Sequence, residues 1–229
     1  MIVVCGDFHG NFNQINQFLC KKPEISMILQ CGDFGWWPRF HNQSALTYSG
    51  RKEVWDQFSL KNKDTKIFWC PGNHEDWEDL KKYSSPKEVM PNVFYMPRNS
   101  VMDLPDGRRV LFMGGAFSID RANRDMRSGA FGWFVEETIT QRDIEELSDE
   151  HIDIVISHTA PIEFVIKNYH IDYAHDPSRD ALSVVLEKYH PKLWYFGHMH
   201  AYQSGVYKGC QWICLSGVGM VSRWWTVLK

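Results

Sequence analysis

Residue types that bind metal ions gather in five short segments, each of which follows an apolar, strand-like run. The ligands that they offer are two carboxylates, one amide oxygen and several imidazoles, without a thiolate. Such mixed oxygen and nitrogen donors favour manganese, iron, zinc, nickel or cobalt and argue against a structural zinc site. Manganese is the metal that we expect. The five segments are Asp7-Phe8-His9, Gly32-Asp33, Gly72-Asn73-His74-Glu75, Ser157-His158 and Gly197-His198-Met199-His200.

A site with two divalent ions would give these donors a chemical purpose. Two ions about 3.5–4 Å apart need a bridging group, and a carboxylate such as that of Asp33 is the natural choice. Such a pair clamps a phosphoryl group and stabilises the charge on its oxygens. It also lowers the pKa of a bridging water, whose hydroxide can then attack the phosphorus. The donor set therefore indicates a metal centre that could hold two ions and act on a phosphoryl group.

Each segment also has an ordinary structural interpretation. The Asp7 segment could be a turn with a capping carboxylate, and the Asn73 segment a turn that needs Asn and Gly for its backbone. His158 alone is more often a buried histidine with a satisfied hydrogen bond than a ligand. The pair His198 and His200 is stronger, because alternate residues of an extended segment point the same way. The joint occurrence of all five segments, each at the end of a strand, favours the metal centre.

The elements that position these segments can be read from the hydrophobic pattern. Strands alternating with helices predict a mainly parallel sheet, and turns at Asp106-Gly107 and Lys208-Gly209 predict added antiparallel hairpins. The predicted helices are Asn13–Cys20, Ala45–Ser59, Thr140–Leu147 and Ser178–Tyr189, the last two with Thr and Ser as N-caps. The predicted strands are Ile2–Cys5, Met27–Cys31, Lys66–Cys70, Val93–Met96, Arg109–Met113, Ile152–Ser157, Lys192–Phe196 and Gln211–Leu215.

These elements predict an α/β architecture of mixed sheets with helices outside. In open α/β sheets, ligand sites gather beyond the carboxyl ends of the strands. We therefore expect the five segments to converge on one cleft.

Bulk properties limit the alternatives. The 229 residues suit a single domain, 1–229, and the formal charge of −3 gives no overall electrostatic signature for nucleic acid. No apolar run is long enough to span a membrane, and the N-terminus lacks the basic start of a signal peptide. Six cysteines without a CxxC pair indicate reduced thiols and a cytoplasmic protein.

The ordered set D-x-H, G-D, G-N-H-E, H and G-H-x-H resembles that of the calcineurin-like metallophosphoesterase superfamily. The resemblance spans Asp7 to His200 and implies a four-layer sandwich of two mixed β-sheets flanked by α-helices. It implies a catalytic set of Asp33, Asn73 and His74, with His74 above the metals as acid to the leaving group or clamp on the phosphate. Glu75 would be structural. The implied ligands are Asp7, His9, Asp33 and His200 for one metal, and Asp33, Asn73, His158 and His198 for the other.

One departure from the family pattern narrows the resemblance. Many members read G-D-x-x-D, but Trp36 replaces the second Asp here, and the arginine typical of Ser/Thr protein phosphatases is absent. Those phosphatases also usually lack the second histidine, which His200 supplies. The sequence therefore resembles the branch of small bacterial and phage phosphodiesterases and repair nucleases.

Further residues are candidates for binding substrate. Three arginines spaced by three residues suit phosphate oxygens, although they could instead pair with Asp120 and Asp125 in a solvated loop. Trp36 could stack on a flat group such as a nucleobase, or pack under the neighbouring loop. The arginines are Arg121, Arg124 and Arg127.

We expect hydrolysis of a phosphodiester or phosphomonoester, with a small phosphate ester, such as a nucleotide, as substrate and no membrane partner. A nucleic-acid-processing nuclease of the same superfamily is one alternative, which the lack of a basic stripe disfavours. A non-catalytic scaffold is another, which the complete ligand set disfavours. The sequence leaves the oligomeric state open.

Overall fold

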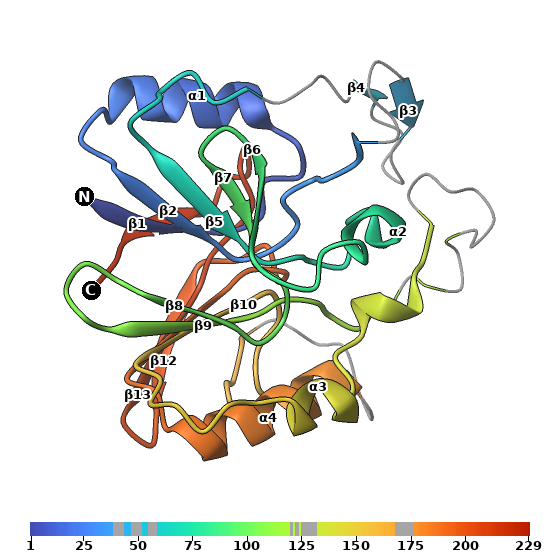
Figure 1. The fold of residues 1–229 in the computed structure, drawn as a ribbon, viewed down its shortest axis with the longest axis vertical. Helices are drawn as coiled ribbons and strands as arrows, with labels where there is room; N and C mark the ends of the chain where they lie inside the picture. The colour runs from blue at the N-terminus through green and yellow to red at the C-terminus, as the bar shows by residue number, and fades with distance from the viewer. Residues whose placement is uncertain are drawn as a thin grey trace.

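The computed structural model describes residues 1–38, 44–46, 52–54, 59–119, 121, 124, 132–167 and 176–229. Two six-stranded mixed sheets form its centre (Figure 1). The first has the order β14-β1-β2-β5-β7-β6, in which β1, β2, β5 and β7 run parallel and the two edge strands run antiparallel. Its strands are β1 (Ile2–Cys5), β2 (Met27–Gln30), β5 (Lys66–Trp69), β6 (Lys87–Met90), β7 (Val93–Tyr95) and β14 (Trp225–Val227).

The second sheet repeats this arrangement. Its order is β12-β13-β11-β10-β9-β8, with four parallel central strands between two antiparallel edges. A separate two-stranded ribbon pairs β3 (Ser44–Leu46) with β4 (Lys52–Val54). The second sheet comprises β8 (Ser100–Asp103), β9 (Arg109–Met113), β10 (Ile154–Ser157), β11 (Leu193–Phe196), β12 (Gln203–Tyr207) and β13 (Cys210–Cys214).

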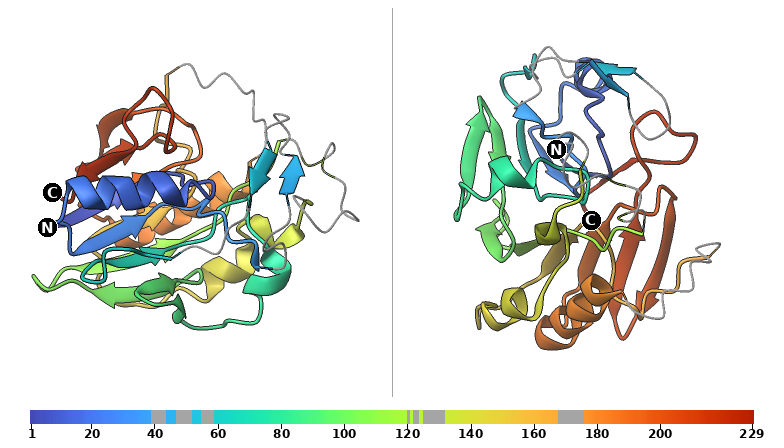
Figure 2. Two further views of the ribbon diagram at one scale, coloured as in Figure 1. Left: turned by 90° about the horizontal axis from the view of Figure 1, so that it is seen from above. Right: turned by 90° about the vertical axis from the view of Figure 1, so that its right-hand side faces the viewer.

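The two sheets pack face to face. Alternate residues of each strand point to opposite faces of its sheet, so each sheet can direct one set of apolar side chains toward the other sheet. One face of each sheet contributes to a shared apolar cluster that includes Val4 and Leu29 from the first sheet and Phe112, Ile154 and Tyr195 from the second. The central strands are apolar on both faces, as strands covered on both sides must be. Helices cover the outer faces, and the right view of Figure 2 shows the resulting layers.

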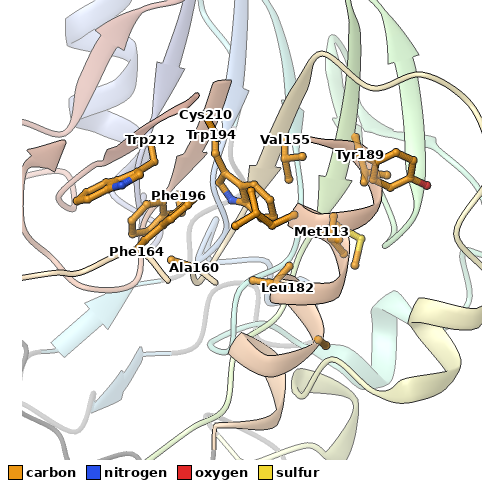
Figure 3. Close-up of a cluster of buried hydrophobic side chains, with 14 of the residues drawn as sticks. Met113, Val155, Ala160, Phe164, Leu182, Tyr189, Trp194, Phe196, Cys210 and Trp212 are labelled. Atoms are coloured by element: carbon orange, nitrogen blue, oxygen red, sulfur yellow. The ribbon is translucent and has the colours of Figure 1, made fainter. Parts of the chain in front are cut away.

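Helix α1 (Phe12–Lys21) covers the first sheet and buries Ile15 and Leu19 against it. Helices α3 (Gln141–Glu145) and α4 (Pro177–Tyr189) cover the second sheet. Leu182 of α4 lies in one cluster with Trp194 and Phe164 (Figure 3). A short helix α2 (Trp77–Leu80) and a 3-10 helix η2 (Val135–Glu137) complete the described helices. No helix in the described ranges has the length and hydropathy needed to cross a bilayer.

The structure confirms the eight predicted strands, with ends that differ by at most two residues, and both predicted hairpins. The predicted helix Ala45–Ser59 is wrong: its described residues lie in β3 and β4, apart from Ser59, which is in neither a helix nor a strand. The rest of the range lies outside the described residues. The N-cap of α4 is Asp176, whose carboxylate accepts from two backbone N–H groups, and not Ser178. Thr140 is the N-cap of α3, as predicted.

Candidate metal centre

The candidate ligands follow the carboxyl ends of five parallel strands, three in the first sheet and two in the second. Asp7 follows β1, Asp33 follows β2, Asn73 follows β5 and His158 follows β10. The histidines of the last segment follow β11. The carboxyl ends of the parallel strands lie at the same edge of the two facing sheets. Loops that are distant in sequence therefore meet at this edge, as expected for ligand sites of α/β sheets.

A first set of donors consists of Asp7, His9, Asp33 and His200, whose donor atoms all lie within 4.8 Å of one another. The Nε2 atoms of His9 and His200 are 3.0 Å apart, and His200 Nε2 is 3.0 Å from Asp7 Oδ2. His9 Nε2 is 3.7 Å from Asp33 Oδ2. Donors about 2.0–2.2 Å from one ion lie about 3–4 Å from each other, so these spacings fit a divalent cation.

A second set of donors lies on the other side of Asp33. His158 Nε2 is 3.3 Å from Asp33 Oδ1 and 3.0 Å from Asn73 Oδ1. The other ring nitrogen of His158 lies 2.8 Å from the carbonyl oxygen of Cys31, to which it donates, so Nε2 is left to bind a metal. The His198 ring is 4.9 Å from the His158 ring. The structure thus brings Asp33, Asn73 and His158 together with His198 beside them, and a second cation held by these four side chains stays a prediction.

Asp33 therefore divides its two carboxylate oxygens between the two sets. Oδ2 faces His9 and Oδ1 faces His158. Oδ1 also accepts a hydrogen bond of 2.9 Å from the backbone N–H of His74, which fixes the carboxylate. A carboxylate that bridges two ions would also direct one oxygen to each of them.

The backbone is unusually constrained around the site. The residues His9, Asp33, His198 and His200 have φ values of 45°, 50°, 63° and 49°, a region that residues other than glycine rarely adopt. Strained conformations of this kind gather at functional sites. The loop ends also approach each other closely, and a Cβ at Gly197 would lie 2.0 Å from Asp7 Oδ1.

Burial and neighbouring charges set the ionisation of the carboxylates, before any cation is considered. Burial alone would raise the pKa of Asp7, but the hydrogen bond with His200 and the charge of His158 bring it below its usual value. Burial also opposes ionisation of Asp33, and the charges of His158 and His74 outweigh it, so its pKa lies well below the usual range. Both side chains are therefore carboxylates at neutral pH.

The two buried histidines differ. Burial lowers the pKa of His198 to about 3, helped by the charge of His158, so His198 is neutral and able to coordinate a cation. Burial would also lower the pKa of His158, but the charge and hydrogen bond of Asp33 raise it to about 9. A cation at the second set must therefore displace a proton from His158.

Glu75 connects two of the ligand loops through hydrogen bonds. Its buried carboxylate accepts from the backbone N–H groups of Phe34, Gly35 and Trp36 at 2.5, 3.1 and 2.6 Å. Burial raises its pKa to about 8 despite these hydrogen bonds. Glu75 thus holds the loop after Asp33 against the loop after β5, in agreement with a structural role.

His74 lies at the edge of the site and is half-buried. Its ring is 6.0 Å from the ring of His9, and its carbonyl accepts from the indole N–H of Trp37. The imidazole of His74 therefore lies beside the first donor set, and its role toward a phosphate ester stays a prediction.

The structure corrects the assignment of Arg124 as a phosphate ligand. Its guanidinium is buried and makes an ion pair of 2.5 Å with Glu137. The same guanidinium donates to the carbonyl oxygen of Asn73 at 3.1 Å. Arg121 is exposed, and its guanidinium lies 4.7 Å from the centre of the Phe117 ring, so its role stays a prediction. Arg127 lies outside the described residues.

Trp36 packs against the protein, which agrees better with the structural alternative than with stacking on a substrate. Its indole lies against the hydrophobic cluster around Trp69, with 6.1 Å between ring centres, and its N–H donates to Asp79 at 2.9 Å. Trp37 is buried. Stacking of Trp36 on a substrate stays a prediction that this packing does not favour.

Ser118 and Glu137 are polar residues near the ligands that the sequence did not single out. Ser118 Oγ accepts from the Asn73 amide at 3.0 Å and donates to Glu137. Ser118 is 45 residues from Asn73 and 19 residues from Glu137 in the chain, so no local motif marks either contact. Only the tertiary structure reveals it.

The model of the calcineurin-like phosphoesterase family matches residues 1–202 of the chain. The matched region contains all five ligand segments. The chain belongs to the calcineurin-like phosphoesterase family. Members of this family typically bind divalent metals, and some members have lost catalysis. A comparison of the sequence with curated proteins finds no match.

Three solved structures are similar to the chain. One crystal structure superposes with a TM-score of 0.51 and 12% identity, over 94% of this chain and 90% of that one. Two others have lower scores. GAP50, the anchor in the inner membrane complex of Plasmodium, gives a TM-score of 0.47 at 13% identity, over 93% of this chain and 70% of that one. A proposed 5'-nucleotidase from Staphylococcus aureus gives a TM-score of 0.48 at 14% identity, over 94% of this chain and 48% of that one.

Proposed function

We propose that the chain is a dinuclear metal-dependent phosphoesterase that hydrolyses a phosphodiester. The observation that carries this proposal is the division of Asp33, whose two oxygens face two separate donor sets. The positive φ values at four candidate ligand positions also support the proposal, because strained backbone gathers at functional sites.

The first cation would be held by Asp7, His9, Asp33 and His200, and the second by Asp33, Asn73, His158 and His198. Two ions placed there supply a clamp for the phosphoryl oxygens and a nucleophile derived from water. The protein's own contribution is to orient these ligands through Cys31, Glu75 and the close approach at Gly197. Manganese is our choice of metal, because the donors mix carboxylate, amide and imidazole.

His74 acts on the leaving group in this proposal. Its ring is not part of either donor set, yet it lies 6.0 Å from that of His9 at the exposed edge of the site. A protonated imidazole there can donate to the departing oxygen or hold a phosphate oxygen. Either role affects turnover without affecting the cations.

A diester is the preferred substrate class for two reasons. The first donor set already contains four protein ligands, which suits an ester with less negative charge than a monoester. Arg124, which would have helped to neutralise a terminal phosphate, is committed to Glu137.

We further propose that the chain belongs to the branch of small bacterial and phage phosphodiesterases. We also propose that it acts as a single domain, and in the cytoplasm, where its six free cysteines stay reduced.

The test compares kcat/KM with manganese for bis-p-nitrophenyl phosphate and for the p-nitrophenyl monoester. We expect the diester value to equal or exceed the monoester value. A preference of more than about tenfold for the monoester, equal to about 1.4 kcal/mol, would reverse the ester class. Absence of hydrolysis of either ester by protein that holds its metals would instead support the scaffold alternative.

A further inference from the structure

A buried polar network lies behind the Asn73 amide, on the side away from His158. Asn73 Oδ1 is 3.0 Å from His158 Nε2, while Asn73 Nδ2 donates to Ser118 Oγ at 3.0 Å. Asn73 is 3% exposed and Ser118 only 1%. One end of the amide therefore faces the second donor set and the other end faces a buried hydroxyl.

The hydrogen bonds of Ser118 have a fixed direction. A hydroxyl has one proton to donate and two lone pairs that accept. Ser118 donates its proton to Glu137 Oε2 and accepts from Arg124 Nη2. A carboxylate can only accept and a guanidinium can only donate, so the remaining lone pair of Ser118 must face Asn73. Only the NH2 end of the amide can use that lone pair, which leaves the amide oxygen toward His158.

The ion pair that sets this direction is itself buried. Glu137 is inaccessible to solvent, and Arg124 is 8% exposed. Glu137 Oε1 accepts from the backbone N–H of Phe134 at 3.1 Å, and Arg124 also donates to the Asn73 carbonyl at 3.1 Å. A buried ion pair is weak evidence of stabilisation, because desolvation offsets much of its attraction. The pair lies directly behind the candidate ligand Asn73, where it can fix the direction of the Ser118 hydroxyl.

We propose that Ser118, held by the Arg124–Glu137 pair, is a positioning residue that fixes the Asn73 amide with its oxygen toward the second cation. The proposal rests on the proposed function, because it needs a cation at that donor set. A reversed amide would aim its NH2 group at the cation and leave Ser118 without a donor. Ser118 and Glu137 thus act on the cation through Asn73 and touch neither substrate nor metal.

Manganese binding measured by calorimetry at pH 8 tests the proposal, since burial raises the pKa of Glu137 to about 7 and the carboxylate is ionised there. We expect Ser118→Ala to weaken one of two equivalents by about 10- to 100-fold and to leave the other unchanged. The matched control is Ser178→Ala. It removes another buried hydroxyl, which accepts from the backbone N–H of Ile139, and should change neither equivalent.

A double-mutant cycle separates positioning from a general structural role. If Ser118 acts through Asn73, then adding Ser118→Ala to Asn73→Ala should weaken the second equivalent no further. A further loss equal to that of the single variant would overturn the proposal. Ser118→Cys, which keeps the volume but accepts hydrogen bonds poorly, provides a second variant that should weaken the same equivalent.

The outcomes also distinguish this inference from the proposed function. If the unmodified protein binds two equivalents and Ser118→Ala binds both as tightly, only the positioning role is overturned. If the unmodified protein binds fewer than two equivalents of manganese, the two-metal centre fails and the positioning role fails with it.

Discussion

Asp33 is the residue on which the two donor sets depend, because each of its oxygens faces one of them. The surrounding residues serve to keep that carboxylate ionised and fixed. The backbone N–H of His74 donates to the Asp33 carboxylate. The charges of His158 and His74 outweigh the effect of burial and lower the pKa of Asp33. The two proposed roles, binding cations and acting on the ester, fall on different residues, so single substitutions can test them separately.

Substitution of two histidines should separate binding from chemistry. We expect His74→Ala to keep both cations and to lose about 10²–10⁴-fold in turnover, because a positioned acid contributes that much. His158→Ala should instead lose the second cation, because its Nε2 belongs to the second donor set. Elemental analysis and turnover of the same samples give both quantities. Loss of cations from His74→Ala, or turnover at the unmodified rate, would show that His74 is wrongly assigned.

Glu137 should make stability depend on pH. Burial raises its pKa to about 7 in the folded chain, against an ordinary value of 4.5. Between these values the folded chain keeps a proton that the unfolded chain releases, so the free energy of unfolding falls as pH rises toward 7 and is then constant. The neutral Glu137→Gln variant lacks this effect.

Urea unfolding of the metal-free protein and of Glu137→Gln at pH 5 and pH 8 measures that dependence. We expect the stability of the protein relative to the variant to be lower at pH 8 than at pH 5 by roughly 2 kcal/mol. A difference that is the same at both pH values would mean that Glu137 ionises normally.

At the scale of the elements, the site depends on how closely the strand ends approach each other. Gly72 and Gly197 leave no space for a side chain: a Cβ at Gly72 would lie 2.0 Å from Asp33 Oδ1, and one at Gly197 would lie 2.0 Å from Asp7 Oδ1. The strand ends bring backbone to within contact of a ligand carboxylate. Asp7 in turn accepts from the backbone N–H of His198 at 3.1 Å.

Gly197→Ala should therefore displace the Asp7 carboxylate and weaken the first cation. Gly107→Ala is the control, because its φ of 86° strains the backbone while no atom lies within 4 Å of the added Cβ. That strain costs about 1–2 kcal/mol but reaches no ligand. We expect fewer than two manganese equivalents after dialysis of Gly197→Ala and two for the control. Full occupancy of Gly197→Ala would contradict the close approach.

The sequence predicted the strands well because apolar runs that end in Gly or Asp are local signals. It placed the ligand segments at strand ends for the same reason. The helix Ala45–Ser59 was wrong because its apolar spacing also fits short strands, and β3 and β4 lie there. The ion pair of Arg124 with Glu137 has no local signal, since burial, which only the tertiary structure shows, decides whether an arginine binds substrate or a neighbour.

At the scale of the whole molecule, the site joins the two sheets. Each donor set draws residues from both sheets: His200 completes the first set, and His158 and His198 complete the second. Cations bound there link loops of the facing sheets. Binding that is confined to the folded chain stabilises it in proportion to the logarithm of the free cation concentration.

The rate of bis-p-nitrophenyl phosphate hydrolysis during a manganese titration tests the two-metal phosphoesterase most directly. With protein at a concentration far above the dissociation constants, we expect the rate to rise until about two equivalents per chain are added and then to stay constant. Asp33→Asn, whose neutral amide bridges two cations poorly, should stay near the background rate throughout. A rate that does not depend on manganese, that saturates at one equivalent, or that Asp33→Asn leaves unchanged would contradict the dinuclear centre.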